Sequence, residues 1–233
     1  MNIYEEHLLP MIKTTCAAME ATDQMQHILH GTTTQERFKW QIRQNYQYLM
    51  EYAKCWALGF AKSQGFDEME QWYKIVKSTF EGTVAFNRSY WAETLNITIE
   101  ELENTIMAEK KRSYTSHEIA RAYEGDLAGC MMGLFPCNVL YMHMGFDLLP
   151  QCKLDKDDPC YKWIEYYTTP EYVAKCQNEI EMINKLCENK TGKELRRLLE
   201  IFAVGCNYEV LQWRDMYSRM ETWPVDELFD FRV

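Results

Sequence analysis

Glycine and proline are scarce in this sequence, with 10 and 6 residues among 233. No alternating run of β-branched residues is bounded by turn signals either, and both features argue against a β-sheet. No apolar run of about 18 residues occurs, as a membrane-spanning helix would need. The first ten residues, MNIYEEHLLP, are acidic where a signal peptide is basic and then hydrophobic. We therefore expect a soluble, cytoplasmic protein that has no membrane partner.

Positive charge is also in short supply. The chain has 35 acidic and 25 basic residues, which gives a net charge of -10. That balance disfavours nucleic acid or an anionic membrane as a partner. Two short basic runs, EKKR at 109–112 and ELRRLLE at 194–200, have acidic neighbours. Both predict solvent-exposed helix faces.

Motifs that mark several classes of site are missing. No GxGxxG, GxxxxGK[ST] or GxSxG occurs. The sequence therefore gives no indication of a glycine-rich nucleotide-binding loop or of the nucleophile elbow of α/β-hydrolases. The nine cysteines include no C-x-x-C pair, and the five histidines form neither H-E-x-x-H nor E-x-x-H. We expect reduced, mostly buried thiols, with no disulfide and no metal. His27 and His30 lie one helical turn apart, and a surface or capping role is favoured over a haem or metal site.

Helical periodicity runs along the whole chain and predicts a single all-α domain over residues 1–233. The predicted helices are 3–21, 34–64, 66–93, 98–109, 114–134, 136–149, 158–167, 169–188 and 191–221. Short connections such as HGTTTQ and SQGFD suit antiparallel neighbours. N-caps are predicted at Thr98, followed by Glu101, and at Thr115 or Ser116.

Three amphipathic stripes each contain one chemically capable side chain among apolar ones. They are Asn45 within residues 38–60, Cys137 within 127–148, and Glu209 within 198–216. A buried carboxylate such as that of Glu209 must find donors or take up a proton as its pKa rises. A structural glutamate bonded to a tyrosine or a backbone amide and a functional one are both compatible with this pattern.

Cys137 by itself indicates little, because buried free cysteines are commonly inert. Pro136 adds to the pattern, since a proline removes a backbone hydrogen bond and predicts a kink or a new helix at this point. A thiol at such a break could meet unpaired amides that favour the thiolate. Four tyrosines lie on segments predicted to converge with it, and they would suit a flat, nitrogen-rich ligand: Tyr48, Tyr114, Tyr141 and Tyr167.

Five segments in order resemble the TenA family, also known as thiaminase II or aminopyrimidine aminohydrolase. They are GTTTQERFKWQIRQNYQYLMEYAK, YTSHE, LFPCNVLYMHMG, YKWIEYY and NYEVLQW. The resemblance implies an all-helical, haem oxygenase-like fold, usually a homotetramer without a cofactor. It also implies hydrolysis of thiamin, or of 4-amino-5-aminomethyl-2-methylpyrimidine, at the exocyclic methylene in thiamin salvage.

The same resemblance implies roles for individual residues. Cys137 would be the nucleophile and Glu209 the acid, while Tyr167 would bind the ring nitrogen. Tyr48 and Tyr114 would support the nucleophile and the pocket. Cys137 and Glu209 also follow from the stripes alone, whereas the tyrosine roles come mainly from the resemblance.

Two positions depart from the family pattern. Asn45 stands where the family has an aspartate, and an amide can pair with a neutral aminopyrimidine but supplies no negative charge for a protonated ring. Gln212 stands where phenylalanine commonly precedes tryptophan, which places a polar group near the pocket. Both departures predict changed rate or substrate choice. The alternatives are a non-catalytic pyrimidine-binding protein that uses Asn45, and a haem oxygenase-like redox protein.

Overall fold

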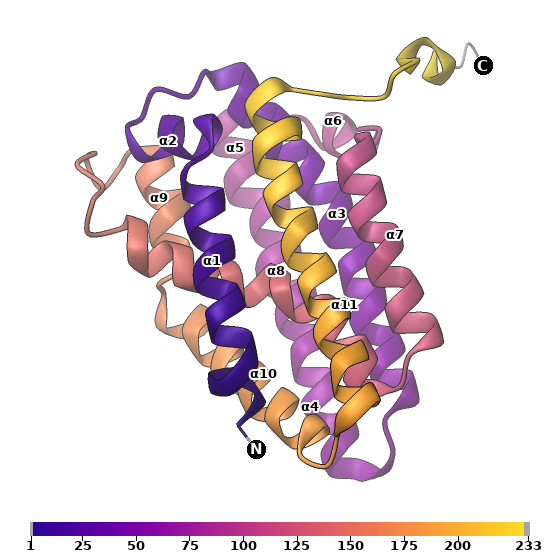
Figure 1. Ribbon diagram of the computed structural model, residues 1–233. Helices are drawn as coiled ribbons and strands as arrows, with labels where there is room; N and C mark the ends of the chain where they lie inside the picture. The colour runs from indigo at the N-terminus through magenta and orange to yellow at the C-terminus, as the bar shows by residue number, and fades with distance from the viewer. Residues whose placement is uncertain (1, 231–233) are drawn as a thin grey trace.

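The computed structural model describes residues 2–230, which form helices and connecting loops with no strand in that range (Figure 1). The α-helices are α1 Leu9–Glu20, α2 Asp23–Leu29, α3 Gln35–Lys62, α4 Gly65–Lys77, α5 Ala92–Leu95, α6 Ile99–Glu103, α7 Glu109–Glu124, α8 Leu127–Leu148, α9 Pro159–Tyr166, α10 Pro170–Cys187 and α11 Gly192–Leu211. Short π-helical stretches are η1 Tyr4–Leu8, η2 Ser78–Val84, η3 Asn87–Trp91 and η4 Gln212–Tyr217, and η5 Asp226–Phe229 is a 3₁₀ turn. The all-α prediction is confirmed.

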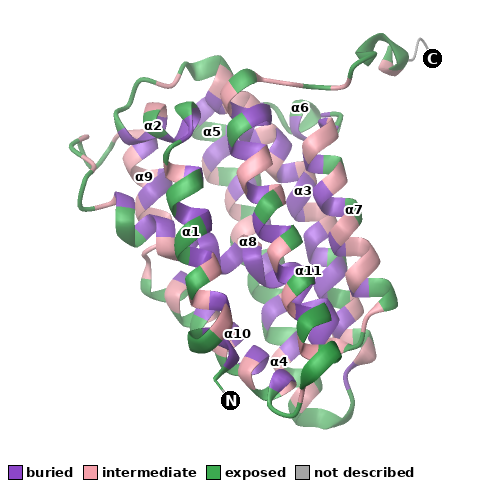
Figure 2. Ribbon diagram, viewed as in Figure 1, coloured by how far each residue is buried: buried purple, intermediate pink, exposed green. Residues whose placement is uncertain are grey.

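Helix α8 is the centre of the bundle. It packs against α1, α3, α7, α10 and α11, and Figure 2 shows it buried along most of its length. This helix is long and apolar enough to cross a membrane by composition, but 83% of its most apolar window is buried inside the protein. Its hydrophobicity is therefore that of a core helix enclosed on all sides by other helices.

Local sequence explains where several helices begin. Side chains of Thr34, Asp126, Asp158 and Thr169 accept backbone N–H groups at the first turns of α3, α8, α9 and α10. Such caps satisfy amide groups that have no partner within the helix. The predicted cap at Thr98 is confirmed, because Thr98 and Glu101 form a reciprocal capping box at the start of α6.

Three predicted helix boundaries are wrong. The helix predicted over 98–109 ends at Glu103, where α6 ends. Thr115 and Ser116 do not begin a helix, because α7 starts at Glu109 and carries both residues in its interior. The helix predicted over 114–134 is divided at Gly125, where α7 ends, and Asp126, which caps α8. The short helix α2 was absent from the prediction.

The predicted helix break at Pro136 is also wrong. Helix α8 continues through Pro136, so no new helix begins beside Cys137. The ring of Pro136 packs against Gly205 of α11, where a Cβ atom would lie 2.8 Å from Pro136 Cγ. The absence of a side chain at Gly205 leaves room for the Pro136 ring between α8 and α11.

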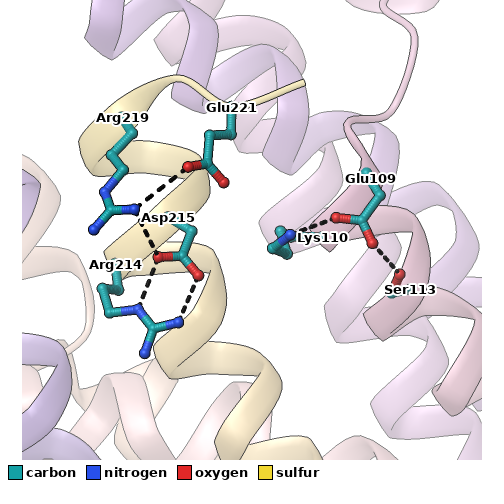
Figure 3. Close-up of polar contacts among 7 residues, drawn as sticks. All are labelled: Glu109, Lys110, Ser113, Arg214, Asp215, Arg219 and Glu221. Carbon is teal, nitrogen blue, oxygen red and sulfur yellow. Dashed lines mark hydrogen bonds and ion pairs between the residues drawn. The ribbon is translucent and has the colours of Figure 1, made fainter. Parts of the chain in front are cut away.

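Ion pairs lie where the last long helix ends near the start of α7 (Figure 3). Asp215 binds Arg214 at 2.7 Å and faces Arg219 at 3.8 Å. Across from them, Lys110 pairs with its neighbour Glu109 at 2.6 Å. The Asp215 side chain is 9% exposed, whereas those of Arg214 and Arg219 are 56% and 63% exposed, so the two cations lie at the surface over a largely buried carboxylate.

Candidate active site

The seven residues singled out in the sequence come together inside the bundle. Asn45 and Tyr48 lie on α3, Tyr114 on α7, Cys137 and Tyr141 on α8, Tyr167 directly after α9, and Glu209 on α11. Five helical segments therefore contribute to one region. The predicted convergence of the tyrosines with Cys137 and Glu209 is confirmed by the contacts described below.

Glu209 is held by a short chain of hydrogen bonds. The Tyr141 hydroxyl donates to Glu209 Oε2 at 3.2 Å, and Trp213 Nε1 donates to the Tyr141 oxygen at 3.1 Å. Glu209 is only 1% exposed, and burial raises the pKa of its carboxyl to about 7. Lys111 and Tyr141 act in the opposite direction by favouring the carboxylate. At neutral pH this carboxyl group can therefore both give and take a proton.

Cys137 lies deep among the helices, although the residue keeps part of its surface accessible. Burial is the main cause that raises the pKa of its thiol, followed by the nearby carboxyls of Glu209 and Glu118. The nearby Tyr48 hydroxyl and the charge of Lys111 act in the opposite direction. The balance raises the pKa of the thiol well above its ordinary value, so the buried setting disfavours the thiolate, which is the reactive form.

Tyr48 connects the nucleophile candidate to a second buried carboxyl. Its hydroxyl donates to Glu118 Oε1 at 2.6 Å, and burial raises the pKa of Glu118 well above its ordinary value. The ring of Tyr48 stacks on Tyr114 with centroids 5.7 Å apart. The Tyr114 hydroxyl lies near enough to lower the pKa of both Glu118 and Glu209, but it forms no hydrogen bond of normal geometry.

A narrow cavity of about 10 Å³, roughly the room that one water molecule needs, lies beside this cluster. Asn45 borders it, and no other side chain in residues 2–230 hydrogen-bonds to the Asn45 amide. Aromatic rings form most of its wall, including those of Tyr141 and Tyr167, whose centroids are 5.0 Å apart. The full lining is Gln41, Ile42, Asn45, Tyr141, Trp163, Tyr167, Trp213 and Tyr217. Flat aromatic walls with a few polar groups are typical of sites for planar ligands.

Gln212 lies one turn beyond Glu209 and is fully buried. Neither atom of its side-chain amide has a hydrogen-bond partner among the described residues. Buried amides without partners are rare, because each lost hydrogen bond to water is costly. Gln212 does not line the cavity itself. Its amide nitrogen and oxygen are an unpaired donor and acceptor one helical turn after Glu209.

Lys111 was missed, since the run EKKR was expected to be solvent-exposed. That expectation is wrong for this residue, whose exposed fraction is 2%. Its Nζ lies 4.4 Å from the centroid of the Tyr48 ring and 5.4 Å from that of Tyr217. A helix start at Glu109 would have revealed it, because Lys111, Tyr114, Thr115 and Glu118 then share one helical face.

Glu118 was missed as well. It is fully buried and belongs to the same face of α7 as Lys111 and Tyr114. The helix predicted over 114–134 contained it, but the polar pattern HEIARAYE has no apolar stripe that would mark its face as buried. The cluster therefore contains two buried carboxyls and one buried amine in addition to the thiol.

Comparison with known proteins agrees with this arrangement. A sequence model described as the TENA/THI-4/PQQC family matches residues 24–220. The chain belongs to that family. The match covers every residue of the cluster, from Asn45 on α3 to Glu209 on α11.

Similar proteins include two enzymes named aminopyrimidine aminohydrolase. The one from Bacillus subtilis (strain 168) is 30% identical over 200 residues, which cover 85% of this chain and 83% of that protein. The one from Helicobacter pylori is 28% identical over 195 residues, covering 83% and 89%. Among solved structures, a TenA family transcription regulator from Silicibacter sp. TM1040 has a TM-score of 0.81 at 22% identity and covers 91% of this chain and 96% of its own. A TenA homologue from P. horikoshii OT3 has a TM-score of 0.79 at 19% identity, covering 90% and 95%. The structural matches show a shared TenA-type fold.

Proposed function

We propose that this protein is a thiaminase II type hydrolase of thiamin salvage. It would cleave the substituent from the exocyclic methylene of a 4-amino-2-methylpyrimidine. The observation that carries the proposal is the placement of a buried thiol, Cys137, near a carboxyl of pKa about 7, Glu209, beside a narrow gap between aromatic rings. Membership of the family and the activity named for its relatives support it.

The two groups divide the chemistry between them. The Cys137 thiolate adds to a ring carbon, and Glu209 gives its proton to the ring nitrogen that receives the electron pair. The substituent then leaves from the methylene with the bonding electron pair and a proton, and water adds to that carbon and gives a proton to Glu209. The Cys137 sulfur departs as the ring nitrogen loses its added proton, which restores the aromatic ring. Tyr141 orients Glu209 through its hydrogen bond, while Tyr48 contacts both Cys137 and Glu118.

The residues around the narrow cavity would hold the heterocycle after moving apart to admit it. Tyr167 offers a ring and a hydroxyl at the wall, and Asn45 offers an amide that forms no side-chain hydrogen bond within residues 2–230. The Asn45 oxygen can accept from a 4-amino group while its NH₂ donates to the neighbouring ring nitrogen. Tyr114 supports the Tyr48 ring by stacking.

Asn45 also favours a second candidate function, a binding protein that holds a neutral pyrimidine without turning it over. An amide lacks the negative charge that would stabilise a protonated ring and draw electrons from it. Binding would then survive where catalysis does not. The homotetramer and the cytoplasmic location remain predictions.

Product identification separates the two candidates. We expect incubation with thiamin and, separately, with 4-amino-5-aminomethyl-2-methylpyrimidine to release the 5-hydroxymethyl pyrimidine, detected by mass spectrometry. Turnover should stop in Cys137→Ala and persist in Cys152→Ala, a matched control at another partly accessible thiol. Full activity in Cys137→Ala would contradict the mechanism. Tight pyrimidine binding by calorimetry with no product would select the binding protein.

A further inference from the structure

Helix α10 binds the residue that follows Cys137. Among the described residues that form or line the candidate active site, none lies on α10. Asn138 is 4% exposed, and its Nδ2 donates to both carboxyl oxygens of the fully buried Glu179, at 2.8 Å to Oε1 and 3.1 Å to Oε2. Lys175, one turn before Glu179, donates to Asn138 Oδ1 at 3.1 Å. Both ends of the Asn138 amide are therefore engaged by α10, which fixes the orientation of the amide.

The main chain around Cys137 is held from two sides. The Tyr172 hydroxyl of α10 donates to the carbonyl oxygen of Asn138 at 3.2 Å. On the other side of Cys137 along the chain, the Tyr52 hydroxyl of α3 donates to the carbonyl oxygen of Leu134 at 2.8 Å. Two tyrosines from different helices thus anchor α8 just before and just after the thiol.

This part of α8 needs such anchors because it contains Pro136. A proline has no N–H, so the carbonyl oxygen of Met132 lacks the donor that an uninterrupted helix would supply. The turn that leads into Cys137 is therefore weaker than its neighbours. Since successive side chains on a helix point about 100° apart, even a small rotation of this turn changes where the thiol points.

Tyr172 also reaches the wall of the candidate site. Its ring lies edge-on to that of Tyr167, with centroids 5.2 Å apart and the planes at 84°. Tyr167 in turn lines the narrow cavity. One side chain of α10 therefore contacts both the main chain beside Cys137 and the aromatic wall that would face the heterocycle.

We propose that Asn138 is a positioning residue, and that its pairing with Glu179, together with the Tyr172 hydrogen bond, sets the direction of the Cys137 thiol. Asn138 acts through the main chain of α8 and needs no contact with the reacting atoms. Its role in turnover rests on the proposed function, whereas its effect on the thiol exists without substrate. A displacement of about 1 Å at a reacting group can lower a rate about a hundredfold.

Variants of the Asn138 and Glu179 pair provide the test. Asn138→Leu removes the amide at similar volume and leaves Glu179 without its donor. The double variant Asn138→Asp with Glu179→Gln exchanges the carboxyl and the amide, so the pair can form again with donor and acceptor reversed. Asn178→Leu is the matched control, because the side chain of this α10 asparagine donates to Met182 Sδ, at 3.5 Å, within the same helix.

Steady-state kinetics on an aminopyrimidine give the first measurement. We expect kcat to fall about tenfold to a hundredfold in Asn138→Leu while KM changes by less than about twofold, because the attacking group is misdirected and the cavity residues are unchanged. The exchange variant and Asn178→Leu should keep the native kcat. A residue that serves stability alone would lower the denaturation midpoint and leave kcat of the folded enzyme as it is.

Alkylation of Cys137 by iodoacetamide without substrate, followed by peptide mass spectrometry, gives the second. Burial is the main cause that raises the pKa of this thiol, so a thiol released from its fixed direction should meet more water. We expect alkylation in Asn138→Leu to be faster by about threefold or more, which corresponds to about half a unit of thiol pKa. The exchange variant should react as the native chain does. Cys55, buried on α3, should stay protected in every variant.

Tyr172→Phe keeps the proposal testable if Asn138→Leu does not fold. It removes the hydroxyl that holds the Asn138 carbonyl and keeps the ring against Tyr167, so both changes should appear to a smaller extent. Tyr166→Phe is its control, because the Tyr166 hydroxyl contacts Thr83.

Native kcat and native Cys137 alkylation in the folded variants would overturn the proposal. Equal loss of protection at Cys55 and Cys137 in both Asn138→Leu and Tyr172→Phe would overturn it as well, since the effect would then not be specific to this thiol. If Cys137 alkylation responds as expected but the native chain turns over no aminopyrimidine, the proposed function alone is contradicted.

Discussion

The Tyr141 hydroxyl donates a hydrogen bond to Glu209 Oε2 at 3.2 Å. This contact joins α8, which carries Cys137, to α11, which carries the carboxyl, so the relative placement of the two helices and the protonation of the site are coupled. A donor to a carboxylate favours its charged form. Two opposing effects therefore set the pKa of Glu209. Burial raises it, while the charge of Lys111 and the hydrogen bond from Tyr141 lower it.

Tyr141→Phe should raise the pKa of Glu209. If protonated Glu209 is the acid, activity falls as the pH rises through about 7. In the variant this fall in activity should occur at a higher pH. Hydrogen bonds to charged groups contribute about 1.5–3 kcal/mol, which corresponds to a shift of about one to two pH units. The measurement is the pH profile of kcat. Tyr166→Phe is the control, because Tyr166 contacts Thr83 and not Glu209. An unchanged limb in Tyr141→Phe would remove Glu209 from the role of acid.

Asn45→Asp should increase turnover of an aminopyrimidine. The aspartate would supply the negative charge that stabilises a protonated ring, and a gain of about tenfold requires only about 1.4 kcal/mol in the transition state. Steady-state kinetics on thiamin and on the aminomethyl pyrimidine measure it. Asn207→Asp adds the same charge at an exposed position of α11 and should leave the rate as it is. No gain on either compound would mean that Asn45 is not what limits the rate.

Glu179→Gln should change how stability depends on pH. Glu179 is fully buried, accepts from Asn138 Nδ2 at 2.8 and 3.1 Å, and has a pKa raised by burial from 4.5 to about 7. The folded state thus binds more protons than the unfolded state between these values, and the free energy of unfolding falls as the pH rises across that window. The loss is about 3 kcal/mol, complete above pH 7.

Urea denaturation at pH 5 and pH 8 checks this expectation. The native chain should lose stability between the two, and Glu179→Gln should lose about 3 kcal/mol less. Glu181→Gln, at an exposed position on the same helix, is the control and should behave as the native chain does. Parallel pH dependence in the native chain and Glu179→Gln would exclude Glu179 as the titrating group.

Gly205→Ala should destabilise the protein by about 1–3 kcal/mol, the usual cost of overpacking a core. The new Cβ would lie 2.8 Å from Pro136 Cγ and 3.3 Å from Pro136 Cβ, next to Cys137 in the chain. Chemical denaturation measures the change. Gly82→Ala is the opposite case, since nothing lies within 4 Å of its added Cβ. Alanine should stabilise that exposed helical position by up to about 1 kcal/mol. Equal denaturation midpoints for Gly205→Ala and Gly82→Ala would show that Pro136 can move to make room for the new methyl group.

The helical class and the three inward stripes could be predicted from the sequence, because the spacing of apolar residues is a local property of the chain. The stripe of α11 is the clearest case. Glu209 occupies an apolar position in it, and its predicted burial is confirmed. The sequence left its partner open, and the structure supplies the hydroxyl of Tyr141. Cys137 was found by the same rule.

The start of α7 and the continuity of α8 could not be predicted, because both depend on contacts between distant segments. Pro136 remains helical where α11 offers Gly205 to its ring. Lys111 is buried because α3 and η4 place Tyr48 and Tyr217 around it. A lysine in a charged run normally stays in water, and the helical face that Lys111 shares with Tyr114 and Thr115 can be recognised only once the start of α7 is known.

The sequence by itself determined which side chains turn inward, since helical periodicity assigns each residue to a face. Only the tertiary structure decided which of those side chains meet. The pKa of Glu209 and the charges around Cys137 arise from burial and from neighbours on other helices. Electrostatic interactions of that kind depend on distance in space and on exclusion of water, and neither is a property of sequence spacing.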